Sequence, residues 1–290
     1  MKKINLLVLS LVTLSCFAQK NTNRISNPAE LNVMTLNVRL DSESDGLNNW
    51  KYRKAVAANT ITYYDADVVG TQEVLHNQLI DLETALPDYT SIGVGREDGM
   101  EKGEYCAIFY NHNRLTEIGS GYFWLSENPM NIGKKGWDAA CERIATWAKL
   151  QDKQTKKIFF VLNTHFDHIG KTARIESAKL ILDKVKLYSK KLPVIVTGDF
   201  NVNPKSEAIK IITDETNPLH LTDTRVISQK VEGPDWTFHD FGRLPLNERE
   251  LIDYIFVKNN VNVLDYKVID EKVDNQFISD HNPVLVRVEL

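Results

Sequence analysis

Strand-like apolar runs recur along the chain, and six of them are bounded by a short group of polar residues. The runs are rich in Val, Ile, Phe and Tyr, which predicts β-strands at residues 31–38, 67–70, 105–110, 144–150, 158–163, 193–197, 252–257 and 283–288. Helical patterns lie between them, at residues 51–63, 76–86, 172–188 and 205–212. Interleaved strands and helices predict an α/β fold, a sandwich of two sheets flanked by helices.

Two segments without strong periodicity, residues 120–142 and 228–250, are predicted to be long loops. Both carry large aromatic side chains, and long loops of this kind often form the rim of a functional site. The candidate rim residues are Trp124, Trp137, Trp236 and Tyr105. Some of the aromatic rings in these segments are expected to fill the core instead.

The first residues have the pattern of a secretory signal at 1–18. Lys2 and Lys3 precede an apolar stretch that is too short to span a membrane comfortably, and a cleavage site follows Ala18. Cys16 allows the alternative of a lipoprotein anchor, but Thr13 fits poorly where such signals carry Leu. We therefore expect an exported protein, periplasmic or extracellular, without stable insertion in a membrane.

Residues 19–290 are expected to form one domain and a monomer. They contain neither an internal repeat nor a Pro/Gly/Ser-rich linker that would divide them. The formal charge of −4 becomes −6 when Lys2 and Lys3 leave with the signal. This balance gives no global basic surface for nucleic acid, although a local basic groove is still compatible with it.

Cys106 and Cys141 are the cysteines of the expected mature chain. Export implies an oxidising compartment, so the two could form a disulfide if their strands are neighbours. Two small apolar residues without a bond are the equally supported alternative.

The polar groups beside the strands combine residue types that suit phosphate chemistry. A single Asn or Asp after a strand is usually a turn former, but six such groups in one chain are a stronger signal. Converging carboxylates without a Lys or Arg cluster are costly to bury unless a cation joins them. Oxygen ligands from Glu73, Asp280 and Asn37 suit Mg²⁺, Mn²⁺ or Ca²⁺. Zinc is disfavoured, because no pair of Cys or His has the short spacing of zinc sites.

In this order along the chain, the motifs LN, QE, TH, GDFN, IDY and SDH resemble those of the endonuclease/exonuclease/phosphatase superfamily, which has the DNase I-like fold. They run from Asn37 to His281 and so cover nearly all of residues 19–290. The resemblance implies a four-layer α/β/β/α sandwich, with two packed mixed β-sheets between helices. The segments FWLSE at 123–127 and GWDAA at 136–140 resemble exported bacterial members whose substrates are undefined.

The resemblance also implies roles for the metal and water motifs. Glu73 would bind a divalent metal ion, and Asn37 and Asp280 would complete or support that site. Asp199 and Asn201 would orient or deprotonate the attacking water and hold the phosphate.

The two histidine motifs and one arginine complete the implied site. Asp253 would hold the imidazole of His281 and favour its protonated form, which donates to the phosphate. His165 would hydrogen-bond a non-bridging oxygen or assist the leaving group. Arg143 stands where many members have a phosphate-facing arginine, although a solvent-facing residue at the start of a strand is the alternative.

The expected reaction is metal-assisted, in-line attack of water on a phosphate monoester or diester. A shared fold does not identify the ester. A secreted nuclease acting on DNA or RNA would need a basic groove, whereas a sugar- or lipid-phosphate hydrolase could use the aromatic loops as a pocket. A non-catalytic scaffold that binds a glycan or another ligand is the remaining alternative. Candidate cations for a groove are Arg96, Lys102, Lys134, Lys135 and Arg243.

Overall fold

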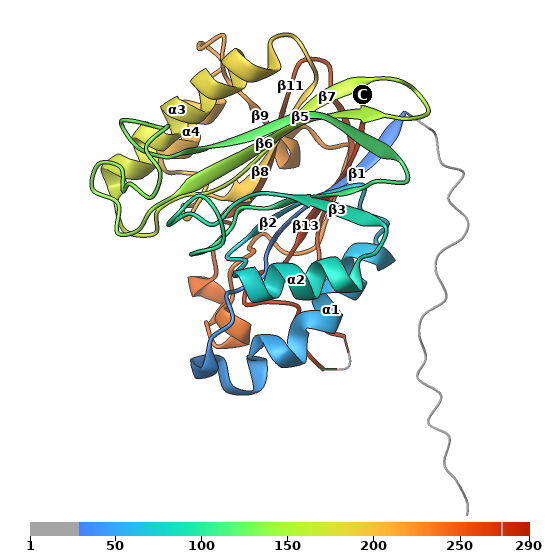
Figure 1. Cartoon of the computed structure of the whole chain (residues 1–290), viewed down its shortest axis with the longest axis vertical. Coiled ribbons are helices and arrows are strands. Elements are labelled where there is room, and N and C mark those ends of the chain that lie inside the picture. Colours follow the sequence, from blue (N-terminus) through green and yellow to red (C-terminus); the bar gives the residue numbers. More distant parts are fainter. Residues whose placement is uncertain (1–28, 274) are drawn as a thin grey trace, which may run out of the picture.

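The computed structural model describes residues 29–273 and 275–290. The expected signal sequence, with Cys16 and the cleavage site after Ala18, lies outside the described residues. Two mixed β-sheets pack face to face, and helices cover both outer faces (Figure 1). The predicted four-layer sandwich is therefore confirmed.

Each sheet is mixed. Over the described residues, one sheet has seven strands in the order β10-β12-β13-β1-β2-β4-β3, and the other has six in the order β5-β6-β7-β8-β11-β9. β1 is parallel to β2 and antiparallel to β13, while β7 is parallel to β8 and β8 is antiparallel to β11. The strands of the seven-stranded sheet are β1 (Glu30–Asn37), β2 (Val68–Gln72), β3 (Tyr89–Ile92), β4 (Ile108–Asn111), β10 (Lys230–Glu232), β12 (Asn262–Val268) and β13 (Val284–Glu289). Those of the six-stranded sheet are β5 (Leu115–Trp124), β6 (Ile144–Asp152), β7 (Ile158–His165), β8 (Val194–Asp199), β9 (Thr222–Asp223) and β11 (Asp253–Lys258).

Helices α1 (Trp50–Tyr63) and α2 (His76–Ala85) cover the seven-stranded sheet, and α3 (Lys171–Ser189) and α4 (Glu207–Thr213) cover the six-stranded sheet (Figure 1). Shorter pieces complete the chain: α5 (Thr224–Ile227) and the 3-10 turns η1 (Glu43–Asn48), η2 (Asp240–Gly242) and η3 (Leu246–Glu248). Across residues 29–273 and 275–290, no helix has the length and apolar character needed to cross a membrane.

Several predicted boundaries are wrong. Residues 120–124, predicted in a loop, belong to β5, which pairs with β6 as far as its last residue. Glycine is depleted in strands, so Gly119 and Gly121 argued against this assignment. Gly119 follows a bulge, and the Gly121 backbone lies against the Trp147 ring. The predicted loop 228–250 contains β10, η2 and η3, and the strand predicted at 105–110 begins only at Ile108.

The central strands alternate between the helix-covered faces and the layer between the two sheets. Val33, Val161, Ile195 and Ile255 all belong to the apolar core of this inner layer. Toward one edge of the sandwich, the inward-pointing residues of the same strands are polar instead of apolar, and they are still buried. They are Thr35, Asn37, Asn163, His165, Thr197, Asp199 and Asp253. Because side chains alternate along each strand, these residues all point into one edge of the inner layer.

At Gly70 of β2 the two sheets lie too close together for a Cβ atom. A Cβ atom at Gly70 would overlap the Thr197 hydroxyl and the Asn163 amide of the opposite sheet. Gln72 Nε2 donates to Asn163 Oδ1 at 2.7 Å, so polar contacts bridge the sheets beside this glycine.

Cys106 and Cys141 are free thiols within the part of the chain that the structure describes. Cys106 is buried with Trp124 and Ile144, whereas Cys141 is half-buried. The structure thus has the unpaired alternative and not the disulfide.

Candidate active site

The structure brings the catalytic and metal candidates together at the polar edge between the sheets. They extend from the ends of β1, β2, β7 and β8, from the start of β11, and from the segment before β13. All are buried except Glu73 and Asn201, which are half-buried. We call this group the catalytic cluster: Asn37, Glu73, His165, Asp199, Asn201, Asp253, Asp280 and His281.

Asp199 lies at the centre of the catalytic cluster. Its carboxylate accepts hydrogen bonds from Asn37 Nδ2 at 3.0 Å and from the Asn201 backbone N–H at 2.9 Å, and His165 Nε2 lies 3.4 Å away. Burial raises the pKa of Asp199 to about 7, and the nearby Asp253 carboxylate adds to the rise. A carboxyl group with a pKa near neutrality is suited to exchanging a proton with water.

His281 and Asp253 form a buried pair. Their Nδ1 and Oδ2 atoms are 2.8 Å apart, and His281 Nε2 lies 3.9 Å from Asp199. Burial alone lowers the pKa of His281, but the carboxylates of Asp253, Asp199 and Asp280 outweigh it and hold this pKa well above its ordinary value. The surrounding carboxylates therefore favour the protonated form of His281, which presents an N–H donor on the side of Asp199.

His165 differs from His281 in charge. Burial lowers its pKa well below the ordinary value, and the positive charges of Arg143 and Arg96 lower it further. Asn201 Nδ2 donates to His165 Nε2 at 2.9 Å, which assigns the proton of the neutral ring to Nδ1. Asn201 adopts a left-handed backbone with φ of 52°, so its side chain returns toward β7.

Arg143 faces the protein interior, so the alternative of a solvent-facing arginine is wrong. Its residue surface is 4 % exposed, and its Nη2 lies 2.9 Å from His168 Nδ1. Nη1 is buried without a hydrogen-bond partner among the described residues. A buried guanidinium with an unused N–H near His165 is suited to binding a phosphoryl oxygen.

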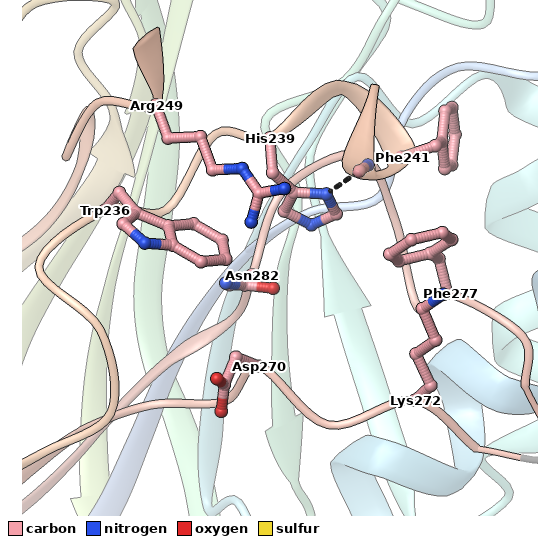
Figure 2. Close-up of a pocket in the computed structure, with 9 residues that line it drawn as sticks. Trp236, His239, Phe241, Arg249, Asp270, Lys272, Phe277 and Asn282 are labelled. Carbon is pink, nitrogen blue, oxygen red and sulfur yellow. Dashed lines mark hydrogen bonds between the residues drawn. The ribbon is translucent and has the colours of Figure 1, made fainter. Parts of the chain in front are cut away.

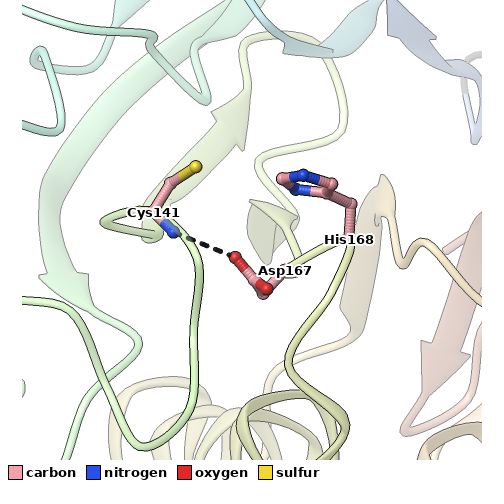
Figure 3. A group of neighbouring side chains, drawn as sticks. All are labelled: Cys141, Asp167 and His168. Carbon is pink, nitrogen blue, oxygen red and sulfur yellow. Dashed lines mark hydrogen bonds between the residues drawn. The ribbon is translucent and has the colours of Figure 1, made fainter.

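Cys141, Asp167 and His168 lie close enough together to suggest a second metal site (Figure 3). Asp167, however, already accepts hydrogen bonds from four backbone N–H groups and from Arg143 Nε. Its oxygens are thus saturated by donors. We interpret Asp167 as the anchor that fixes the Arg143 loop.

Glu73 and Asp280 are the carboxylates that the motifs assign to a metal ion, and the geometry groups Glu73 with His165 and Asp199 as possible ligands. Glu73 accepts from Asn37 Nδ2 at 2.9 Å and from the Leu40 backbone N–H at 3.1 Å. The motifs indicated no Lys or Arg beside these acids, but Arg39 lies 3.9 Å from Glu73 and 3.8 Å from Asp280. Arg39 follows the LN motif by two residues, so the motif itself was a signal for it.

Negative charge still exceeds positive charge in this cluster. Arg39 also pairs with Asp45 at 3.0 Å. The four carboxylates of the cluster and Asp45 outnumber the guanidinium groups of Arg39 and buried Arg53 and the imidazolium of His281. An excess of buried oxygen donors suits a hard divalent cation. The side chains present therefore fit the metal that the motifs imply.

Two of the four rim candidates are core residues. Trp124 and Tyr105 are each 2 % exposed. Trp124 donates to the Arg96 carbonyl at 2.7 Å, and the Tyr105 hydroxyl donates to the Met100 carbonyl at 3.0 Å. Their placement at a substrate rim is therefore wrong, whereas Trp137 and Trp236 are half-buried and remain accessible.

Glu104 is a neighbour of the catalytic cluster that the motifs did not indicate. It lies 4.0 Å from His165 Nδ1, the nitrogen that carries the proton, and it pairs with Arg96 at 2.6 Å. Arg96 is thus engaged by a carboxylate and is not a free cation for a nucleic-acid groove. Glu104 follows a glycine in a loop between strands, a position that is not distinctive in sequence.

A sandwich of two mixed sheets with Asp, His and Asn side chains buried at its edge defines a hydrolase that acts on ester bonds. The chain belongs to the Endonuclease/Exonuclease/phosphatase family, whose model matches residues 34–281. The resemblance of the six motifs to this family is therefore confirmed.

Similar proteins occur in bacteria and in a virus. An endonuclease/exonuclease/phosphatase from Bacteroides vulgatus is 47% identical with a TM-score of 0.87, covering 90% of this chain and 99% of that one. A mannosyl-6-phosphatase from Bacteroides thetaiotaomicron is 38% identical with a TM-score of 0.83, covering 90% and 100%. An uncharacterized protein of Acanthamoeba polyphaga mimivirus is 25% identical over 275 residues, 89% of this chain and 100% of that protein.

Proposed function

We propose that this chain is a divalent-metal-dependent phosphoesterase that hydrolyses a small phosphorylated sugar by in-line attack of water. The observation that carries the reaction class is the burial of Asp199 between neutral His165 and protonated His281. The sugar is supported by the similarity to the mannosyl-6-phosphatase, which this chain matches over the whole length of that protein.

Asp199 is the proposed general base. Its carboxylate would take a proton from the attacking water, while Asn37 and Asn201 hold it in place through the hydrogen bonds to its two oxygens. Protonated His281 would donate to a phosphoryl oxygen as negative charge grows there, and the Asp253 contact keeps that imidazolium oriented.

Arg143 and His165 are the further proposed phosphate contacts. The unused Nη1 of Arg143 would bind a non-bridging oxygen. Glu73, Asn37 and Asp280 would hold the divalent cation, Mg²⁺ in our proposal. When bound, such a cation neutralises negative charge on the phosphoryl oxygens.

We also propose that the protein is exported, on the pattern of residues 1–18. Mass spectrometry of the protein from an envelope or culture fraction would then give a mature chain that begins at Gln19. A cytosolic chain that retains residues 1–18 would contradict export, and lipid on Cys16 would select the anchored alternative.

Hydrolysis by residues 19–290 tests the proposed function. The substrates are mannose 6-phosphate, glucose 6-phosphate, a bis-aryl phosphodiester and plasmid DNA, each with Mg²⁺, Mn²⁺ or Ca²⁺ and with EDTA. We expect metal-dependent release of phosphate from the hexose phosphates. The Asp199→Asn variant should lose this activity, and Asp214→Asn, on an exposed turn, should keep it. Nicking of DNA without turnover of sugar phosphates would replace the sugar phosphatase with the nuclease.

A further inference from the structure

A cavity of about 440 Å³ lies beside the catalytic cluster and has no role in the chemistry described above (Figure 2). It opens between the loop 236–249 and the segment 270–282. We call it the side pocket. The side chains that matter here are Trp236, His239, Arg249, Asp270, Phe277 and Asn282.

The side pocket shares its backbone with the catalytic cluster. Phe238 and His281 form an isolated β-bridge, which is fixed by hydrogen bonds from the His239 N–H to the Asp280 carbonyl and from the Asn282 N–H to the Thr237 carbonyl. Asn282 of the pocket is thus the next residue after His281. This peptide link makes the side pocket and the catalytic cluster neighbours in the chain.

Arg249 and Trp236 form one wall of the pocket. The guanidinium carbon of Arg249 lies 4.4 Å from the centroid of the Trp236 ring. Arg249 Nε donates to the Leu244 carbonyl at 3.0 Å, and this bond fixes the plane of the guanidinium. Figure 2 shows its terminal nitrogens directed toward the cavity, above Asn282. The wall therefore presents fixed N–H donors beside an aromatic surface.

Asn282 adds a donor at the base of the pocket, where His239 contacts its side chain. His239 Nδ1 accepts from the Gly242 N–H at 3.0 Å, so the neutral ring carries its proton on Nε2. Asn282 is only 7 % exposed, and its Nδ2 has no hydrogen-bond partner among the described residues. A buried amide N–H₂ without a partner costs free energy, which a bound oxygen atom would recover.

Asp270 and Lys272 give the pocket charged groups of both signs. The exposed carboxylate of Asp270 lines the same cavity as Arg249, so the pocket offers an acceptor as well as donors. Hydroxyl groups, which both donate and accept, match this mixture, and the apolar face of a sugar ring suits the aromatic wall.

We propose that the side pocket binds the uncharged hydroxylated ring of the substrate while the catalytic cluster holds its phosphate. This inference rests on the proposed function, because it takes the phosphate ester as given and assigns the rest of the molecule. Arg249 and Asn282 donate to ring hydroxyls, and Asp270 accepts from them. The pocket thereby selects phosphorylated sugars over phosphate esters without a ring.

The kinetic test compares one substrate with a ring and one without. In the Arg249→Met and Asp270→Asn variants, kcat/KM for mannose 6-phosphate should fall about 10- to 100-fold, the loss typical of a charged hydrogen-bond partner. Hydrolysis of propyl phosphate should stay within about twofold of the parent. The matched controls are Arg287→Met and Asp265→Asn, which remove an ion pair at β13, outside the pocket.

Two kinetic outcomes would overturn the assignment. Equal losses for both substrates would mean that Arg249 and Asp270 act through the catalytic cluster, and unchanged kinetics for mannose 6-phosphate would mean that the ring does not enter the pocket. A preference for fructose 1,6-bisphosphate that grows in Asp270→Asn would assign a second phosphate to the pocket instead.

A binding measurement separates this inference from the proposed function. Mannose 6-phosphate is titrated calorimetrically into Asp199→Asn and into the double variant Asp199→Asn with Arg249→Met, so that no turnover is required. We expect about 10-fold weaker binding in the double variant. Equal binding by both proteins would overturn the ring site. If the double variant binds more weakly but the parent protein hydrolyses no phosphate ester, only the proposed reaction is overturned.

Discussion

The catalytic cluster and the side pocket are neighbours in the chain but are built by different means. The cluster consists mainly of strand ends, most of its side chains are buried, and hydrogen bonds join Asn37 to Glu73 and Asp199 and His281 to Asp253. The pocket consists of loop residues, includes exposed Asp270, and keeps an unpartnered amide at Asn282. A rigid paired site suits chemistry that needs fixed geometry, and a site with unused donors suits the recognition of a variable group.

The largest expected difference between the two regions is in turnover. Asp199→Asn removes the carboxylate that accepts the proton, so kcat should fall roughly 10²- to 10⁴-fold for every phosphate ester. The thermal unfolding temperature should not decrease, because the change removes one negative charge from a cluster with an excess of them. If kcat fell for some phosphate esters and not for others, the cluster would also contribute to substrate recognition, and the distinction between the two regions would be wrong.

The His281 pair should control the pH dependence of turnover. The Asp253 carboxylate raises the pKa of His281, so Asp253→Asn should lower that pKa. Since protonated His281 is the donor, the loss of activity at alkaline pH should move to lower pH, and kcat should fall about 10²-fold at neutral pH. A pH profile of kcat with an unchanged alkaline limb would remove His281 from the role of donor.

Two glycine substitutions compare how tightly the backbone is packed beside the catalytic cluster and in the side pocket. Gly70→Ala forces a Cβ against Thr197 and should destabilise the protein by about 3 kcal/mol, with loss of activity on all esters. Gly242→Ala strains a residue with φ of 78° in the side pocket and should cost about 1 kcal/mol. Denaturant unfolding measures both. Equal costs would show that the pocket loop is as tightly packed as the contact between the sheets.

The last comparison concerns stability and pH at the side pocket. Burial lowers the pKa of His239 to about 4, below the ordinary value of 6.5. The unfolded chain then binds this proton more readily, so the His239 contribution to stability is complete above pH 6.5 and is lost as the pH falls toward 4. His239→Gln should reduce the slope of unfolding free energy against pH by up to about 1.4 kcal/mol per unit. The same slope in His239→Gln and the parent would contradict a buried neutral imidazole, and His220→Gln is the control.

Much of the fold and of the catalytic cluster follows from the sequence. The apolar runs predict the central strands β1, β7, β8, β11 and β13, and the interleaved helices predict the two outer layers. The six motifs contain every residue of the cluster, because each motif is at the edge of a strand whose alternation points it inward. The short β3 and the irregular β12 have weak apolar patterns, and β5 contains glycines, so local sequence does not predict them.

The sequence by itself determined the layers, the family and the residue types of the site, because strand alternation and motif chemistry act over a few neighbouring residues. Only the tertiary structure decided that Trp124 and Tyr105 fill the core, that Arg39 neutralises part of the charge at Glu73, and that Asn282 opens into a pocket. These outcomes depend on contacts between segments far apart in the chain. Burial and pairing of a side chain are properties of that packing, and no local pattern specifies them.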